Sequence, residues 1–256
     1  MLYELHRKTP NNIGDYWCNP SRYFNFGEVK SGELVNNKFP VTDQSVIIGG
    51  GGLIHKKFQT DIEKILDKKP KLSALWGIGH NFGRKHVIKS GENVYYPDWI
   101  NKSQLIGIRD WIEGYKKYYV PCVSCMHSAF DKTYETKHDI VYFLHAYKSN
   151  FIPKENDVCM KNNEKDFNKV IKFLASGRTI VTDSYHGAYW SQLLGKDVKI
   201  VSWSVKFDHM KYPPEVLDSI NTAPKFSKTN VPKNYLEECR TYNNNFYKKF
   251  MEKYND

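Results

Sequence analysis

Short apolar runs alternate with helix-like patterns along most of the chain. The segment 45–54, "SVIIGGGGLI", predicts a buried strand that runs into a glycine loop. A helix is expected next, because four apolar residues then fall on one face at a period of 3.6: Phe58, Ile62, Ile65 and Leu66. Residues 71–81 and 103–111 repeat the strand-and-loop pattern. Alternation of this kind predicts a parallel sheet covered by helices.

A second series of the same kind begins near residue 137. The unbroken apolar run 140–144 suits a strand that is buried on both faces. The next helix is predicted to begin with Asn163 as its N-cap, to end at Gly177, and to bury Phe167, Val170, Ile171 and Leu174. Another strand, a helix closed by Gly195 and a further strand follow.

The polar stretch 130–138 separates the two series and is the best candidate for a linker. We therefore expect an N-terminal domain over residues 1–132 and a C-terminal domain over residues 133–256. The C-terminal segment places Tyr235, Cys239, Tyr242, Phe246 and Phe250 on one face. That face predicts a last helix that packs across a domain.

Composition indicates a folded globular protein, with 256 residues, 40% hydrophobic and 15% aromatic. No apolar run approaches the roughly 20 residues of a membrane span, and "MLYELHRKTP" lacks the apolar core of a signal peptide. A cytoplasmic location is expected. The five cysteines, an odd number, predict reduced thiols.

The net charge of +10 is spread along the chain and forms no basic arm of the kind that binds nucleic acid. No nucleic-acid partner is therefore expected. A basic surface could attract a phosphorylated substrate, or make a peripheral contact with an acidic membrane leaflet. Solubility alone would also account for scattered lysines.

The most informative polar residues lie in the segment 179–201, at the boundary between a predicted strand and the helix that follows it. Ligands of open α/β sheets collect at the carboxyl ends of the strands, where Ser184, Tyr185, His186 and Gly187 would lie. Gly187 would allow close approach of a ligand, and His186 could contact an anion or transfer a proton. Alternatively, His186 only caps its own helix.

The segment "ASGRTIVTDSYHGAYWSQLLGKDVKIV" resembles the C-terminal signature of the polysaccharide pyruvyl transferase family, with its His-Gly pair between a strand and a helix. Other pieces occur in the family's order: "NNIGDYW", "IIGGGGLI", "LWGIGHN", "IGIRDW" and "VSWSVKFDHMK". Two departures stand out. Many members carry Arg-Leu where this chain has Ser184-Tyr185, and only residues 152–163 separate the first strand of the second series from its helix.

The resemblance implies two Rossmann-like domains in a glycosyltransferase-B-like arrangement, the second shortened, with a cleft between them. It also implies phosphoenolpyruvate as co-substrate, with no cofactor. Pyruvate would be transferred as a ketal onto two hydroxyls of a saccharide acceptor, in a surface polysaccharide or its lipid-linked precursor.

Phosphoenolpyruvate carries a carboxylate and a phosphate, so its site needs several cations. Arg109, at a predicted strand end, is the first candidate, since a guanidinium can bind an anion bidentately; the alternative is an ion pair with Asp110. His186 is assigned to anion contact and general acid catalysis. Lys206 would contact the phosphate, unless it is a solvated lysine, and Ser184, Tyr185 and Gly187 complete the expected donor site.

The acceptor side is expected to come from the first domain. By resemblance Asn12, Gly14 and Asp15 line the cleft, where Asp15 could accept a proton from an acceptor hydroxyl or serve only as a turn or capping residue. Two further groups are assigned to the cleft lining: the glycines at positions 49–52, Gly50 and Gly51 among them, and His127.

Cys122, Cys125 and His127 have a metal-like spacing. A second ligand pair of matching type is missing from the sequence, so no metal is expected.

Two alternatives stay open. The same fold could serve a glycosyltransferase that uses a nucleotide-sugar, although the shortened second domain leaves little room for a base and ribose pocket. The chain could also be a non-catalytic carbohydrate-binding subunit, for which the Ser184-Tyr185 departure is the best support.

Overall fold

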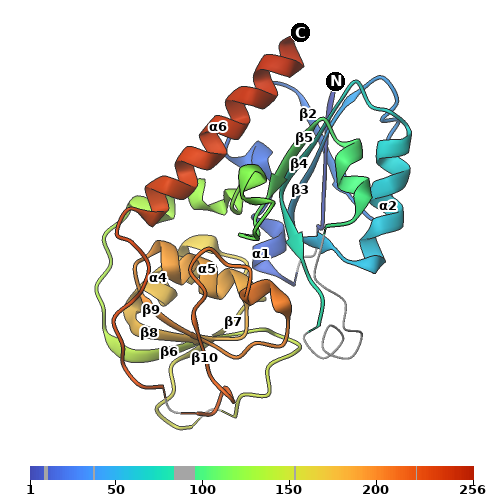
Figure 1. The fold of residues 1–256 in the computed structure, drawn as a ribbon. Coiled ribbons are helices and arrows are strands. Elements are labelled where there is room, and N and C mark those ends of the chain that lie inside the picture. Colours follow the sequence, from blue (N-terminus) through green and yellow to red (C-terminus); the bar gives the residue numbers. More distant parts are fainter. Residues whose placement is uncertain (9–10, 37, 84–95, 153, 223) are drawn as a thin grey trace.

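A computed structural model describes residues 1–8, 11–36, 38–83, 96–152, 154–222 and 224–256. It contains two parallel five-stranded sheets with helices packed on them (Figure 1), which confirms the predicted Rossmann-like α/β class. The first sheet consists of β1 (Leu2–His6), β2 (Val29–Glu33), β3 (Ser45–Ile54), β4 (Leu72–His80) and β5 (Leu105–Ile108). The second consists of β6 (His138–Leu144), β7 (Cys159–Lys161), β8 (Gly177–Thr182), β9 (Asp197–Ile200) and β10 (Glu215–Val216).

The α-helices are α1 (Ile13–Tyr16), α2 (Lys56–Asp67), α4 (Phe167–Ser176), α5 (Tyr185–Leu193) and α6 (Tyr235–Asn255). Short 3-10 helices lie in the connections: η1 (Pro20–Arg22), η2 (Asp98–Lys102), η3 (Lys116–Tyr118), η4 (Val123–Met126), η5 (Ser128–Asp131) and η6 (Val205–Phe207).

The two sheets share one topology. The strand orders are β2-β1-β3-β4-β5 and β7-β6-β8-β9-β10, so each sheet has the order 2-1-3-4-5 when its own strands are counted along the chain. In such doubly wound sheets the chain reverses direction across the sheet next to the first strand, and a crevice opens there at the carboxyl ends. The switch points lie between β1 and β3 and between β6 and β8.

The helices follow the predicted periodicity. Helix α2 buries Phe58, Ile62, Ile65 and Leu66, the four residues expected from the sequence. Helix α4 likewise buries its predicted face, with Gly177 as C-cap. Its N-cap is Asp166 rather than Asn163, because the Asp166 carboxylate accepts hydrogen bonds from the backbone N–H groups of Asn168 (2.9 Å) and Lys169 (3.3 Å).

The glycine run does not form the expected loop after a strand. It lies inside β3, where the register with β4 shifts between Gly51 and Ile54. Gly50 and Gly51 have φ values of 55° and 91°, which favour glycine, so the strand bulges there and continues.

Helix α6 joins the two halves. Its first turns place Tyr235 and Cys239 in the apolar cluster of the second sheet, whereas Phe246 and Phe250 pack with Trp76 against the first sheet (Figure 1). The Trp76 indole also donates a hydrogen bond of 2.9 Å to Asn243. The helix therefore packs across both sheets. No helix in the described part of the chain is long and apolar enough to span a membrane.

Candidate functional site

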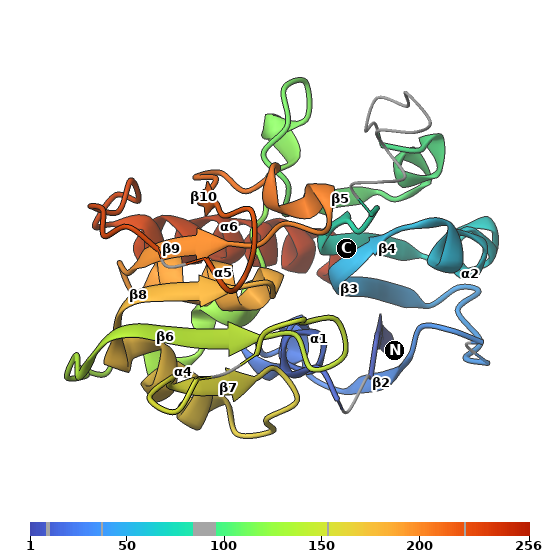
Figure 2. The same cartoon turned by 90° about the horizontal axis from the view of Figure 1, so that it is seen from below.

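A cavity of about 380 Å3 lies at the carboxyl ends of both sheets. Figure 2 shows strands β6, β8 and β9 pointing toward the first sheet. Segments that follow β1, β3, β4 and β5 line one side of the cavity, and segments that follow β6, β8 and β9 line the other. The lining residues are Asn12, Asp15, Gly52, Lys57, Asn81, Arg109, His145, Lys148, Asn162, Ser184, Tyr185, His186, Trp203 and Lys206. The cavity is therefore bordered by both switch points.

The short helix α1 holds the cavity residues that follow β1. The side chain of Asn12 caps this helix by accepting a hydrogen bond from the Gly14 N–H at 3.1 Å. Its amide group also donates to Asp15 Oδ2 at 3.0 Å, which fixes the carboxylate. Asp15 is thus held by the helix cap without being the cap. The same end of the helix meets the second half of the chain, since the Ile13 N–H donates to the Asn162 carbonyl at 2.9 Å.

Ser184 organises the site after β8. Its hydroxyl accepts from the Gly187 N–H and so caps α5, which shows that His186 is not the cap. The carboxylate of Asp183 accepts from the His145 N–H at 2.6 Å, and the Asp183 carbonyl accepts from the Trp203 indole at 2.8 Å. These bonds tie the loops after β6, β8 and β9 to one another.

Lys206 lies on η6, which is anchored to the first domain. The hydroxyl of Ser204 donates to the Phe82 carbonyl at 2.7 Å, and the Val205 N–H donates to the same oxygen at 3.2 Å. Both domains therefore position Lys206, even though it belongs to the second.

Arg109 and Lys206 are buried cations without a carboxylate partner. Their side chains are only a few per cent exposed, and neither forms an ion pair with any described residue. Arg109 Nε and Nη1 also lack a hydrogen-bond acceptor among these residues. The guanidinium lies instead over the Tyr185 ring, 3.9 Å from its centroid. Nearby carboxylates still act on both groups through space, Asp110 and Asp15 on Arg109, and Asp15 and Asp183 on Lys206. Cations that form no ion pair within the described residues can bind an anionic ligand.

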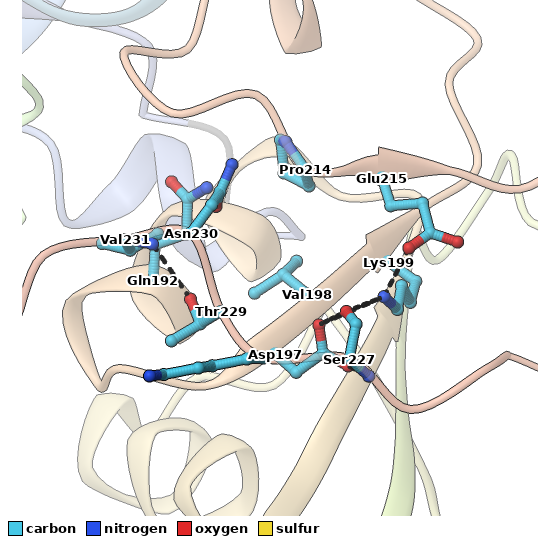
Figure 3. A pocket seen from close by; sticks show the side chains of 11 residues that line it. Gln192, Asp197, Val198, Lys199, Pro214, Glu215, Ser227, Thr229, Asn230 and Val231 are labelled. Carbon is cyan, nitrogen blue, oxygen red and sulfur yellow. Dashed lines mark hydrogen bonds and ion pairs between the residues drawn. The ribbon is translucent and has the colours of Figure 1, made fainter.

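A second cavity, of about 190 Å3 beside β9 and β10, provides the contrast (Figure 3). Its buried Lys199 lies 2.6 Å from Glu215 and 3.2 Å from Asp197, and it donates to the Ser227 hydroxyl. That ammonium is fully paired inside the protein. Lys199 thus differs from Arg109 and Lys206, which form no ion pair with any described residue.

Burial and the clustered positive charge shift the pKa values of the cavity residues. Burial, with Arg109 second, lowers the pKa of Lys206 to about 7. Burial, then Lys206 and Lys148, lowers the pKa of His145 to about 4. The pKa of His186 falls well below its usual value for the same reasons, burial first and then Arg109 and Lys206. Desolvation raises the pKa of Asp15.

The two histidines are consequently neutral at pH 7. His186 can then contact an anion as a hydrogen-bond donor, while its assignment as general acid stays a prediction that requires a bound anion to raise its pKa. Lys148 and Lys206 supply charge at the same end of the cavity, with ammonium groups 3.7 and 3.9 Å from the centroid of the Trp203 ring. Lys206 is buried and is not the solvated lysine considered as an alternative.

The structure brings seven of the sequence-predicted site residues to one cavity: Asn12, Asp15, Arg109, Ser184, Tyr185, His186 and Lys206. Two glycines lie directly beside it. A Cβ at position 14 would collide with the imidazole of His186, and a Cβ at position 51 would lie 3.4 Å from Asp15 Oδ1. Gly14 therefore allows the two domains to approach each other at the site.

Three predicted site residues lie elsewhere. His127 caps η5 by accepting from the Ala129 N–H at 3.0 Å, and its ring packs on Phe167. Gly187 is required by packing, because a Cβ there would meet Phe143 and Thr182. Gly50 faces Cys18 in the same way. The sequence signals at these positions, a histidine and two glycines, reflect local structure rather than the cavity.

Gly52, from the glycine run assigned to the cleft, also lines the cavity. Six lining residues were not singled out from the sequence: Lys57, Asn81, His145, Lys148, Asn162 and Trp203. Asn81, His145 and Asn162 directly follow β4, β6 and β7, at the carboxyl ends of parallel strands where ligands of open α/β sheets collect. The sequence predicts β4 and β6, so this rule could have found Asn81 and His145. Lys148 and Trp203 carry no comparable local signal.

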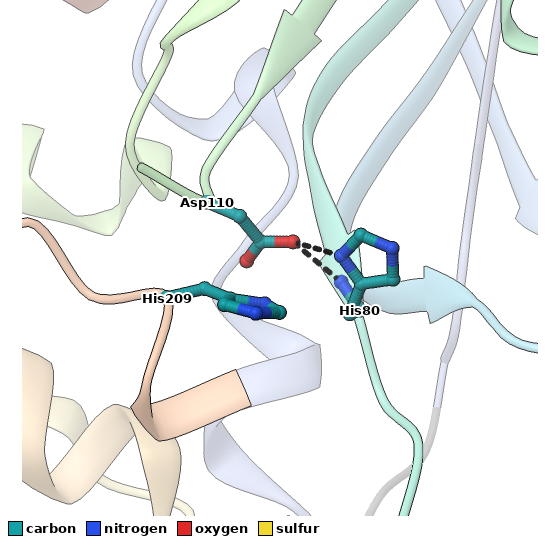
Figure 4. A group of neighbouring side chains, drawn as sticks. All are labelled: His80, Asp110 and His209. Atoms are coloured by element: carbon teal, nitrogen blue, oxygen red, sulfur yellow. Dashed lines mark hydrogen bonds and ion pairs between the residues drawn. The ribbon is translucent and has the colours of Figure 1, made fainter. Parts of the chain in front are cut away.

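His80, Asp110 and His209 are the residues of the described chain that could hold a metal ion, with ligand atoms within 4.8 Å of one another (Figure 4). Asp110 Oδ2 is already occupied, since it accepts from the His80 N–H at 2.7 Å, bonds His80 Nδ1 at 2.8 Å and accepts from Tyr96 at 3.0 Å. Arg109 is the adjacent residue and raises the electrostatic cost of a cation there. Through its bonds to His80, Asp110 connects the end of β4 to the segment after β5, whereas its Oδ1 and His209 Nδ1 have no hydrogen-bond partner among the described residues.

The chain matches no family model and no curated protein. Among solved structures it is similar to an uncharacterized protein of Klebsiella pneumoniae subsp. pneumoniae NTUH-K2044, with a TM-score of 0.50 and 13% sequence identity. The alignment covers 84% of this chain and 91% of that one. At this identity the similarity concerns the fold alone, and it supports the assignment of the chain as a Rossmann-like α/β protein.

Proposed function

We propose that this protein transfers pyruvate from phosphoenolpyruvate to a saccharide acceptor as a ketal, with its two Rossmann-like domains in a glycosyltransferase-B-like arrangement. The observation that carries the proposal is the pair of buried, unpaired cations, Arg109 and Lys206, in one cavity. Lys57 and Lys148 also line it, against the single carboxylate of Asp15. Such a cavity favours a small ligand with more than one negative charge.

Phosphoenolpyruvate fits this charge distribution at both of its ends. Arg109 would bind one anionic group through its planar fork. Lys206 and Lys148, which share the Trp203 ring, would bind the other, and His186 would donate a hydrogen bond to the ligand. The phosphate belongs at the lysine end, because it carries the larger charge and two ammonium groups lie there.

Asp15 is placed to act on the acceptor. In ketal formation one sugar hydroxyl adds to C2 of the enol while C3 gains a proton, and a second hydroxyl then displaces phosphate from C2. The two hydroxyl protons are accounted for by C3 and by the departing phosphate. Asp15, whose pKa is raised by desolvation, would accept the first hydroxyl proton and pass it on to C3, so that the carboxylate is regenerated.

The test is to incubate the purified protein with phosphoenolpyruvate and a panel of oligosaccharides, and to measure release of inorganic phosphate. Release that requires an oligosaccharide, with a matching gain of mass on that sugar, is the expected result. Release of a nucleotide from a sugar nucleotide would show a glycosyltransferase instead. Saturable binding of sugar with neither reaction would show a carbohydrate-binding subunit.

A separate measurement of phosphoenolpyruvate binding by calorimetry does not depend on knowing the acceptor. Arg109→Met is expected to weaken binding by about 10²–10³-fold. Arg178→Met is the matched control, because Arg178 is exposed on β8 and does not line the cavity. Equal affinity in the two variants would contradict the proposed site.

A further inference from the structure

A chain of hydrogen bonds connects His186 to the segment that follows the first sheet. Cys122 precedes η4, and its Sγ lies 3.5 Å from His186 Nε2 and 3.2 Å from the Ser124 hydroxyl. The Ser124 hydroxyl in turn lies 2.9 Å from the indole nitrogen of Trp190. Trp190 is one turn after His186 on α5. The series of hydrogen bonds therefore starts and ends on this helix and passes through Cys122 and Ser124.

The Trp190 indole fixes the direction of one bond, and the other two can be assigned consistently from it. An indole nitrogen can only donate, so Trp190 donates to Ser124 Oγ. The Ser124 hydrogen then goes to its other partner, Cys122 Sγ. With the sulfur accepting from Ser124, its own S–H has one acceptor among the described residues, which is His186 Nε2.

An Nε2 atom that accepts a hydrogen bond carries no proton. Burial, with Arg109 and Lys206, lowers the pKa of His186 well below its usual value, so the ring is neutral. In this assignment of the bonds its single proton lies on Nδ1. Nδ1 has no hydrogen-bond partner in the described part of the chain. Because His186 lines the cavity while Nε2 is turned to Cys122, Nδ1 is the nitrogen available to a ligand.

We propose that Cys122 is a positioning residue, whose thiol donates to His186 Nε2 and thereby holds the proton on Nδ1 as a hydrogen-bond donor to the bound anion. The binding of an anion at Nδ1 rests on the function proposed above. The position of the proton on the His186 ring does not depend on that function. The thiol suits this task, since it is fully buried and burial raises its pKa, so it stays protonated.

The decisive measurement is the tautomer of His186 in 15N-labelled protein, read from long-range proton–nitrogen NMR spectra and assigned with His186→Gln. The wild type is expected to show a neutral ring protonated on Nδ1. Cys122→Ala removes the donor, and the ring should move to the Nε2–H form that free imidazole prefers in water. Cys122→Ser retains a donor and should keep Nδ1–H.

Cys125→Ala is the matched control, because Cys125 is equally buried and contacts Asn243 rather than His186. An Nε2–H tautomer in the wild type would overturn the proposal, and so would an unchanged tautomer in Cys122→Ala. Affinity for phosphoenolpyruvate should fall about tenfold in Cys122→Ala and recover in Cys122→Ser. If the wild type binds no phosphoenolpyruvate, the proposed function fails while the spectra still decide the tautomer.

Discussion

The two sheets have the same strand order but contribute different chemistry at their switch points. The first sheet contributes an amide, a carboxylate and a glycine, from Asn12, Asp15 and Gly52. The second contributes a hydroxyl and two imidazoles, from Ser184, His186 and His145, and its Lys206 brings positive charge. Topology thus determines where a ligand can bind, whereas the loop residues determine which ligand.

The first half also contributes two cations, Lys57 and Arg109, and the Arg109 guanidinium stacks on Tyr185 of the second half. Both halves therefore contribute cations to the anion site, whereas its lining carboxylate, Asp15, comes from the first half. Variants on the two sides should consequently affect catalysis and binding differently.

The largest expected effect is on turnover in Asp15→Asn. Loss of a positioned base should lower kcat by about 10²–10⁴-fold. Binding of phosphoenolpyruvate should hold or tighten, because the substitution removes a negative charge from an anion site. Phosphate-release kinetics with acceptor and calorimetry without it measure the two quantities. A parallel loss of binding would mean that Asp15 supports the fold of the site instead.

The next largest effect is expected from Arg109→Met, which should lower the affinity for phosphoenolpyruvate by about 10²–10³-fold. A loss of this size is expected when the cation that pairs with a buried anionic group of the ligand is removed. Arg109→Lys should recover only part of the affinity, since an ammonium cannot bind bidentately. Arg178→Met should behave as the wild type. Full recovery by lysine would indicate a simple point charge at this position.

Lys206→Met should weaken binding by about 10-fold to 100-fold, the range of a hydrogen bond to a charged group. It should also stabilise the free protein by about 1–4 kcal/mol, because it removes a buried and unpaired ammonium. Thermal unfolding without ligand measures the second effect. Lys228→Met, in an exposed residue, is the control for general loss of charge. A lower Tm in Lys206→Met would argue that Lys206 is paired in solution.

Gly14→Ala should separate the two sides of the site without changing any charge. The new Cβ would collide with the His186 ring, and overpacking of this kind costs about 1–3 kcal/mol. Gly83→Ala is the control, because no atom lies within 4 Å of a Cβ built there. Denaturant unfolding of both variants compares them. Equal stability would show that the two sides move apart easily.

The smallest effect expected is the pH dependence of binding. The pKa of Lys206 is lowered by burial to about 7 in the free protein, and a bound dianion should raise it. Affinity is therefore expected to be highest near pH 7 and to fall by at most about tenfold per pH unit above it, until the pKa of the complex is reached. Calorimetry between pH 7 and 9 would show the slope, and Lys206→Met should lack it.

Local sequence patterns determined the elements of this protein. The buried faces of α2 and α4 followed from a period of 3.6 residues, and the parallel sheets followed from the alternation of strands and helices. The position of Arg109, Ser184 and His186 at strand ends was predictable for the same reason. Each of these features depends on residues close together in the chain, where backbone geometry and periodic burial act directly.

Only the tertiary structure decided which polar residues share the cavity and which charges go unpaired. The cavity is lined by Lys148, Asn162 and Trp203, which the sequence did not indicate, because loops distant in sequence meet there. His127, which was predicted to line it, caps η5 instead. The same holds for the two buried lysines. Lys199 is paired by Asp197 and Glu215, whereas Lys206 has no carboxylate partner among the described residues. Desolvation and Coulomb interactions act through space, so their outcome depends on how the chain folds rather than on spacing along it.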